Sequence, residues 1–302
     1  MAAFTIYNFR FIKINAELQT SLFPMPQDEP KMALTQSWGQ KQDILNDILH
    51  RENLKFKHRN RVYDHRITEM PTAKGVYVLR ISNNRQTNIE ENFQKKKIEN
   101  HPSCYVFIDN RQGPEALQTI AIQKLSTAFT ATDQVAKILT NTFNVILQNY
   151  SMQIEITAKY HSQTFWTFVE KHQDIKLVRF KFPMPNMGMN GKRMSEWISQ
   201  LTDETNGGPT MQLEAPSSQV LTLSPDKEAL QDIVELSSAN GLEIKFKIVG
   251  EKAFITIGTG EDTYVNIDFK EDILAQLQMS DISDKVLNAI LTFCNNLKYS
   301  YQ

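Results

Sequence analysis

Apolar and polar residues alternate along several segments of this chain, which is the period of a strand with one buried face. Residues 4–15 alternate in this way near the start of the sequence. Residues 103–109 are almost all apolar, so we expect a strand that is covered on both faces. A turn signal of Asn, Gly and Pro at 110–114 predicts that 119–124 returns as its hairpin partner. Other strands are expected at 75–81, 152–160, 176–182, 219–223, 243–249, 253–258 and 263–269.

Apolar residues at helical spacing predict helices between these strands. A short amphipathic helix is expected within 40–53 and a longer one over 132–150, where Thr132 or Asp133 could form the cap. Ser224-Pro225 is expected to start a helix over 226–239, which Asn240-Gly241 would end. The polar residues 89–99 predict a connector with some helix. Further helices are expected at 162–172, 194–201 and 281–297.

Hairpins and helices follow one another without regular strand–helix alternation, which favours an α+β fold with mixed or antiparallel sheets. The length of 302 residues is enough for two domains. Charge divides the chain, because residues up to Thr202 carry 26 basic and 18 acidic side chains, whereas those from Asp203 carry 7 and 16. We therefore expect a basic N-terminal domain at 1–182, a linker with a short helix at 183–218, and an acidic C-terminal domain at 219–302.

The composition of the chain indicates the class of protein and its expected location in the cell. Hydrophobic residues make up 41% and charged residues 22%, as in globular proteins. No run approaches the length of an apolar membrane span, so no membrane insertion is expected. The N-terminus alternates instead of resembling a signal peptide. Cys104 and Cys294 lie in apolar segments and are expected to be buried thiols, which fits a cytoplasmic protein.

Motifs for phosphate loops, dinucleotide turns, zinc sites and nucleophile elbows are absent from the sequence. We therefore expect no cofactor, no metal and no catalytic residue, although enzymatic activity stays open. The nearest nuclease-like arrangement combines Asp109 and Glu155 with Lys124 or Lys159. Ile122 stands where such enzymes place a second metal-binding acid. Asp109 could equally start a turn, and Glu155 with Lys159 could form a surface ion pair.

The most basic segment is 51–66. Its lysines and arginines alternate with other residues, so on one strand they would share a face. Such cations neutralise phosphates, while Phe56 and Tyr63 could stack on bases or anchor the strand. A solvated strand or a contact with the acidic C-terminal domain explains the run about as well. The candidate nucleic-acid-binding residues are Lys55, Lys57, His58, Arg59, Arg61 and Arg66, with Lys95, Lys96 and Lys97 as an extension of the patch.

The layout from Val76 onward resembles bacterial phage-defence accessory proteins, namely the Rex-type exclusion protein and the DNA-binding subunit of Kiwa systems. Three segments carry the resemblance, VYVLRIS, HPSCYVFIDNR and QTIAIQK, the last followed by a long helix. The resemblance implies a cytoplasmic, dimeric, DNA-binding component of a defence system without catalysis of its own. No family motif can be matched position by position, so the resemblance assigns no functional residue in this chain.

We therefore expect a non-catalytic nucleic-acid-binding component of a bacterial anti-phage system, with DNA as the expected ligand. The acidic C-terminal domain would contact a protein partner or mediate self-association, so a homo-oligomer is expected. Two alternatives remain open. One is a metal-dependent nuclease effector, and the other is a scaffold or inhibitor that binds only protein.

Overall fold

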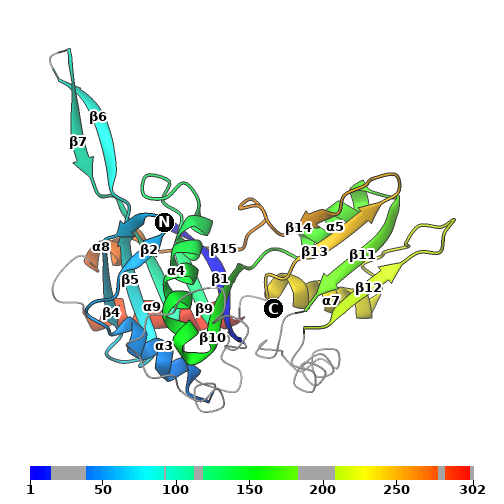
Figure 1. Ribbon diagram of the computed structural model, residues 1–302, viewed down its shortest axis with the longest axis horizontal. Helices are drawn as coiled ribbons and strands as arrows, with labels where there is room; N and C mark the ends of the chain where they lie inside the picture. The colour runs from blue at the N-terminus through cyan, green and yellow to red at the C-terminus, as the bar shows by residue number, and fades with distance from the viewer. Residues whose placement is uncertain (15–38, 92, 112–117, 183–207, 278–282, 300–302) are drawn as a thin grey trace.

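The computed structural model describes residues 1–14, 39–91, 93–111, 118–182, 208–277 and 283–299. It shows an α+β fold built on a large and a small antiparallel sheet, from which a hairpin arm projects (Figure 1). This confirms the fold class expected from the sequence. No helix among the described residues combines the length and apolar character needed to cross a membrane.

The large sheet has the strand order β10-β1-β9-β8-β5-β4, and β15 pairs with the first residues of β1. β8 and β9 are antiparallel neighbours, as their turn signal predicted. The central strand β8 is buried along nearly its whole length, which accounts for its continuous apolar sequence. The strands are β1 (Ala2–Lys13), β4 (His65–Glu69), β5 (Val76–Ser82), β8 (Ser103–Asp109), β9 (Thr119–Gln123), β10 (Met152–Ala158) and β15 (Asn266–Phe269).

Helices cover both faces of the large sheet (Figure 1). One face packs against α3 (Lys41–Leu49) and α4 (Thr132–Leu147), which bury the apolar residues that the helical spacing predicted. The other face packs against α8 (Glu271–Gln276) and α9 (Asp284–Tyr299). Cys104 and Cys294 are both buried thiols, as expected.

The cap of α4 differs from the expectation that Thr132 or Asp133 would provide it. The helix begins after Ala131 without a side-chain cap of its own. The Glu261 carboxylate instead accepts hydrogen bonds from the backbone N–H and the hydroxyl of Thr132. Asp133 accepts hydrogen bonds from the hydroxyls of Tyr7 and Tyr264. The first turn of α4 is therefore fixed by residues distant in sequence.

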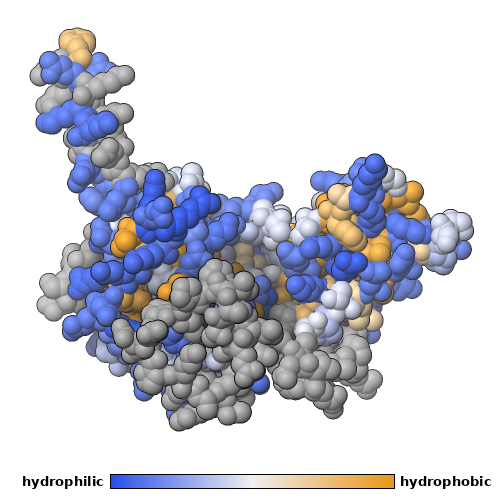
Figure 2. Space-filling view, in the orientation of Figure 1, coloured by the Kyte–Doolittle hydropathy of each residue, from blue (hydrophilic) through white to orange (hydrophobic). Residues whose placement is uncertain are grey.

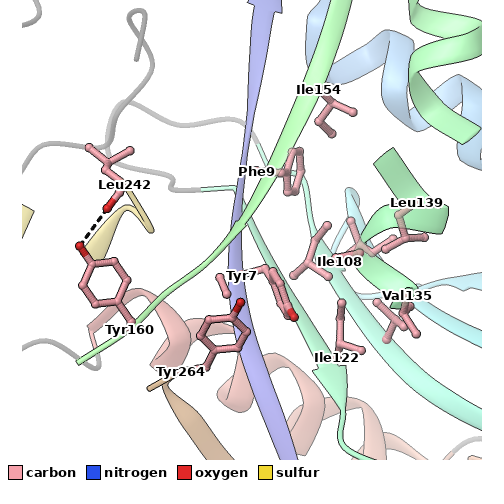
Figure 3. Packing of buried hydrophobic residues seen from close by; sticks show 14 of the residues in the cluster. Tyr7, Phe9, Ile108, Ile122, Val135, Leu139, Ile154, Tyr160, Leu242 and Tyr264 are labelled. Carbon is pink, nitrogen blue, oxygen red and sulfur yellow. Dashed lines mark hydrogen bonds between the residues drawn. The ribbon is translucent and has the colours of Figure 1, made fainter. Parts of the chain in front are cut away.

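The small sheet has the order β12-β11-β13-β14 and packs against two helices. One apolar cluster runs from the large sheet into this part, and the Tyr160 hydroxyl donates to the Leu242 carbonyl at 2.8 Å within it (Figure 3). The elements are α5 (Gln163–Lys171), β11 (Ile175–Lys181), β12 (Thr210–Glu214), α7 (Glu228–Ala239), β13 (Ile244–Ile248) and β14 (Ile255–Ile257).

The division between the sheets does not coincide with the expected boundaries at 182/183 and 218/219. β11, from the expected basic domain, pairs with β12 and β13, which come from the expected linker and acidic domain. β15, near the C-terminus, pairs with β1 at the N-terminus. The acidic C-terminal segment therefore contributes to both sheets, because strand pairing joins residues that local composition separates.

Three local expectations are wrong. Residues 89–99 are not a connector, since β6 (Arg85–Glu91) and β7 (Gln94–Asn100) pair as the projecting arm (Figure 1). Residues 219–223 form no strand, although the Leu221 N–H donates to the Ile175 carbonyl. α7 begins at Glu228, so Pro225 precedes it by a turn. The helix expected at 194–201 lies outside the described residues.

Candidate nucleic-acid interface

The basic segment folds into a tight hairpin rather than one strand. β2 (Phe56–His58) and β3 (Arg61–Tyr63) are antiparallel, and Arg59 and Asn60 form the two-residue turn between them. Arg59 has a φ of 54°, in the left-handed region that residues other than glycine rarely adopt. The expectation that Lys55, Lys57, Arg59 and Arg61 share one strand face is therefore wrong, because the chain reverses between the last two.

The two faces of the β2–β3 hairpin have different environments. Phe56, His58, Arg61 and Tyr63 project from one face, because Phe56 pairs with Tyr63 and His58 with Arg61. Phe56 is fully buried and packs edge-on against Phe143 of α4, with ring centroids 6.0 Å apart. It anchors the hairpin and is not accessible for base stacking, which removes it from the two stacking residues considered above.

Hydrogen bonds to α4 hold β2 in place. The backbone N–H of Lys57 donates to Thr142 Oγ1 at 3.0 Å. The His58 ring is hydrogen-bonded to the side-chain amide of Asn141. Together with Phe56, which packs on Phe143, these contacts fix β2 along the C-terminal half of α4, and the hairpin turn lies beside Gln134 and Lys137 of the N-terminal half.

A cleft of about 520 Å³ lies between the hairpin and α4. Its walls come from the hairpin, from the first turns of α4, from the segment before α4 and from the end of β5. Figure 2 shows a mostly hydrophilic surface around the upper end of α4. The lining residues are His58, Arg59, Asn60, Arg61, Tyr63, Asn83, Phe129, Gln134, Lys137 and Ile138.

The cleft is cationic. Arg59, Arg61 and Lys137 are exposed at its walls, and none of the lining residues that the structure describes is acidic. Within the described part of the chain, none of these three side chains forms an ion pair. Three positive charges that converge without a carboxylate favour a ligand with more than one negative charge.

The floor of the cleft is apolar and aromatic. Ile138 and Phe129 are buried, and Tyr63 is half-buried with its ring 6.0 Å from that of Phe129. The side-chain amides of Asn60, Asn83 and Gln134 add polar groups around this floor. Cations and amides that share a cleft with an aromatic surface have the chemistry that recognises the phosphate and the base of a nucleotide.

The other candidate cations lie elsewhere. Lys55 and Lys57 are exposed on the outer side of the hairpin, away from Phe56. Arg66 of β4 lies directly opposite Arg80 of β5. Because the neighbouring residue Ile67 packs on the α4 side of the sheet, Arg66 projects from the opposite face. The structure therefore does not bring Arg66 together with the cleft.

Lys95, Lys96 and Lys97 lie on β7 of the arm, where their backbones pair with Glu90, Ile89 and Asn88. Lys96 and Lys97 are exposed and project from opposite faces of the two-stranded arm. The arm starts two residues after Asn83 of the cleft and carries Phe93, which is 97% exposed, at its turn. These lysines extend outward from the cleft instead of forming one patch with it.

The residues of the nuclease alternative do not converge. Asp109 is buried and forms a two-point ion pair with Arg111, whose Nη2 lies 2.6 Å from Oδ2. Glu155 pairs with Arg10, also at 2.6 Å, on the far side of β9 and β1 from Asp109. Lys159 is buried, and Lys124 follows the opposite end of β9 from Asp109. Among the described residues, no group of three His, Cys, Asp or Glu could hold a metal ion.

Sequence reasoning missed several lining residues, above all Lys137. Gln134, Lys137 and Asn141 are spaced i, i+3 and i+7 in α4, so they share one exposed helix face. The shared helix face could have been predicted from this spacing in the sequence. The position of that face beside the hairpin could not. Phe129 and Asn83 lie in loops and reach the cleft only through the tertiary fold.

Neither a protein-family model nor a curated protein matches this sequence. The function of the protein is therefore inferred from the geometry and chemistry of the cleft.

Proposed function

We propose that this protein binds nucleic acid in the cleft between the β2–β3 hairpin and α4, without catalysis of its own. The observation that carries the proposal is that Arg59, Arg61 and Lys137 line the same cleft as Tyr63, with no acidic residue among the described lining residues. Arginine and lysine side chains neutralise phosphates and release the counterions that surround them. Aromatic rings next to such cations can hold bases by stacking.

Phosphate contacts dominate this type of binding, so the proposed sequence specificity is low. Lys55 and Lys57 on the outer side of the hairpin and Lys96 and Lys97 on the arm are exposed and add long-range attraction for a polyanion. The protein is therefore expected to capture a polymer that extends beyond the cleft. DNA is the expected polymer, and RNA offers the same phosphate and base chemistry.

The biological setting is a further part of the proposal and depends on the layout resemblance. That resemblance favours a cytoplasmic component of a bacterial anti-phage system, acting as a homo-oligomer or with a protein partner. The acidic segment offers surface for such contacts. The paired state of Asp109 and Glu155 gives the nuclease alternative no comparable support.

The experiment is a binding titration with the full-length protein. Fluorescence anisotropy of labelled DNA and RNA oligonucleotides gives the affinity of the wild type and of an Arg59→Ala/Arg61→Ala/Lys137→Ala variant. Circular dichroism confirms that the variant is folded. The wild type is expected to bind, and the variant is expected to bind at least about tenfold more weakly. Equal affinities would contradict the assignment of the cleft, and co-purification with protein but no nucleic acid would favour the scaffold alternative.

A further inference from the structure

We infer that the cleft holds an unpaired base of a single-stranded polynucleotide, with the flanking phosphates bound by Arg59, Arg61 and Lys137. This inference rests on the proposed function and specifies the form of nucleic acid that the site recognises. It follows from the shape of the cleft, from the composition of its floor and from the position of its cations.

The shape favours a ligand that enters the protein surface. The volume of about 520 Å³ falls within the range of roughly 300–1,000 Å³ that is usual for small-ligand sites. The hairpin forms one wall and α4 the other, so the polar rim encloses a recess instead of a flat track. A duplex presents phosphates on its outside and keeps its bases stacked, so it cannot fill such a recess without losing a base pair.

The floor has the chemistry of a base-binding surface. Tyr63 is half-buried, packs against the apolar cluster that includes Phe129 and Ile138, and has its ring 6.0 Å from that of Phe129, so the core holds the ring in place. A supported aromatic ring loses little conformational freedom when a base stacks on it. The amides of Asn60 and Gln134 carry donors and acceptors at the same cleft, suited to the edge of an unpaired base.

The cations flank this floor from both walls. Arg59 and Arg61 belong to the hairpin, whereas Lys137 belongs to α4. A strand that places a base on Tyr63 would therefore have its adjacent phosphates near positive charge on either side. Burial of Phe56 and the hydrogen bond from Lys57 to Thr142 fix the spacing of the two walls before any ligand binds.

A competition experiment with full-length protein tests the inference. The probes are a labelled single-stranded 12-mer, a duplex of the same length, and a 12-mer of abasic residues that keeps every phosphate and removes every base. DNA and RNA versions of the single strand distinguish the two polymers. We expect the duplex and the abasic strand each to bind about tenfold or more weakly than the base-containing strand.

Two substitutions of Tyr63 provide the matched comparison. Tyr63→Leu keeps an apolar contact with Phe129 but removes the ring, and we expect it to weaken binding of the base-containing strand by about tenfold. The same variant should bind the abasic strand as the wild type does. Tyr63→Phe keeps the ring and removes only the hydroxyl, so it should bind both strands with wild-type affinity. A loss of affinity in this variant would mean that the hydroxyl, and not the ring, is needed.

The outcomes separate the inference from the proposed function. Wild-type protein that binds duplex and abasic strands as tightly as the base-containing strand would overturn the inference and leave the proposed function standing. Equal effects of Tyr63→Leu on base-containing and abasic strands would also overturn it. Wild-type protein that binds none of the nucleic acids would overturn both.

Discussion

Phe56 and Tyr63 lie opposite each other across the β2–β3 hairpin and project from the same face. The Phe56 ring is fully buried against Phe143, whereas the Tyr63 ring is half-buried in the floor of the cleft. One face of a short hairpin therefore both anchors it to the core and forms the binding surface. The positions of Arg59 and Arg61 depend on this anchor, because both belong to the turn region that it holds.

Replacing Phe56 with alanine is expected to lower the free energy of unfolding by about 3–5 kcal/mol, because it leaves a cavity beside Phe143. Val62 provides the control, since it lies on the outer side of the same hairpin and is 52% exposed. Val62→Ala is expected to change the unfolding free energy by no more than about 0.5 kcal/mol. Urea denaturation measures both, and equal small effects would mean that the hairpin is not anchored through Phe56.

The Asp109–Arg111 pair is expected to stabilise the fold instead of serving catalysis. Asp109→Asn should lower the free energy of unfolding by roughly 3 kcal/mol, because it breaks a buried ion pair. Nucleic-acid affinity should be unchanged, since Asp109 does not line the cleft. Urea denaturation and anisotropy provide the two measurements. Wild-type cleavage of nucleic acid with Mg²⁺ that disappears in a folded Asp109→Asn variant would instead support the nuclease alternative.

Lys159 gives the protein a predictable pH dependence. Burial lowers the pKa of its ammonium from 10.5 to about 8, although Nζ lies 3.4 Å from the Leu297 carbonyl. Between these two pH values the unfolded chain binds the proton more tightly than the folded protein does. The contribution of this residue to stability therefore rises as pH increases from about 8 to 10.5.

Lys159→Met is expected to remove that rise and to raise the free energy of unfolding at pH 7 by roughly 1–3 kcal/mol. Urea denaturation of both proteins at a series of pH values measures the difference. A variant that is less stable than the wild type throughout the series, by a constant amount, would show that the buried ammonium is a net stabilising group.

The arm is expected to be dispensable for folding and to contribute only modestly to binding. Among the described strands, β6 and β7 pair only with each other. Joining Arg85 to Asn100 through a short glycine turn should therefore change the melting temperature by no more than a few degrees. Lys95→Ala/Lys96→Ala/Lys97→Ala should weaken nucleic-acid binding less than the triple substitution in the cleft does. Loss of binding without the arm, with the cleft intact, would move the interface to the arm.

Much of the architecture could be predicted from local patterns. The apolar run of β8 and the alternation of β1 reflect burial on two faces and on one face, respectively. The pairing of β1 with β15 and the cap that Glu261 provides for α4 could not be predicted, because each joins residues more than 100 positions apart. Composition placed the domain boundaries by charge, whereas backbone pairing determines which strands share a sheet.

The basic segment was expected to form a single strand, whereas it folds into the β2–β3 hairpin. Alternation continues through Arg59 and Asn60, and no glycine marks the turn, so the segment resembles one strand. The turn forms because Arg59 adopts a positive φ while Phe56 and Tyr63 pack inward on either side of it. The register of the arm, which pairs Glu90 with Lys95, could likewise not be predicted, because the segment is rich in charged residues and has no apolar alternation.

The salt dependence of binding shows whether Arg59, Arg61 and Lys137 neutralise phosphates in the cleft. The logarithm of the association constant for a single-stranded oligonucleotide falls linearly with the logarithm of salt concentration, by about 0.7 for each neutralised phosphate. Arg59→Ala/Arg61→Ala/Lys137→Ala should therefore reduce the slope by about 2. The control, Lys171→Ala/Lys227→Ala/Lys252→Ala, removes the same charge from exposed positions of the small-sheet part and should keep the wild-type slope. A cleft variant with the wild-type slope, or a control variant with an equal reduction, would contradict binding in the cleft.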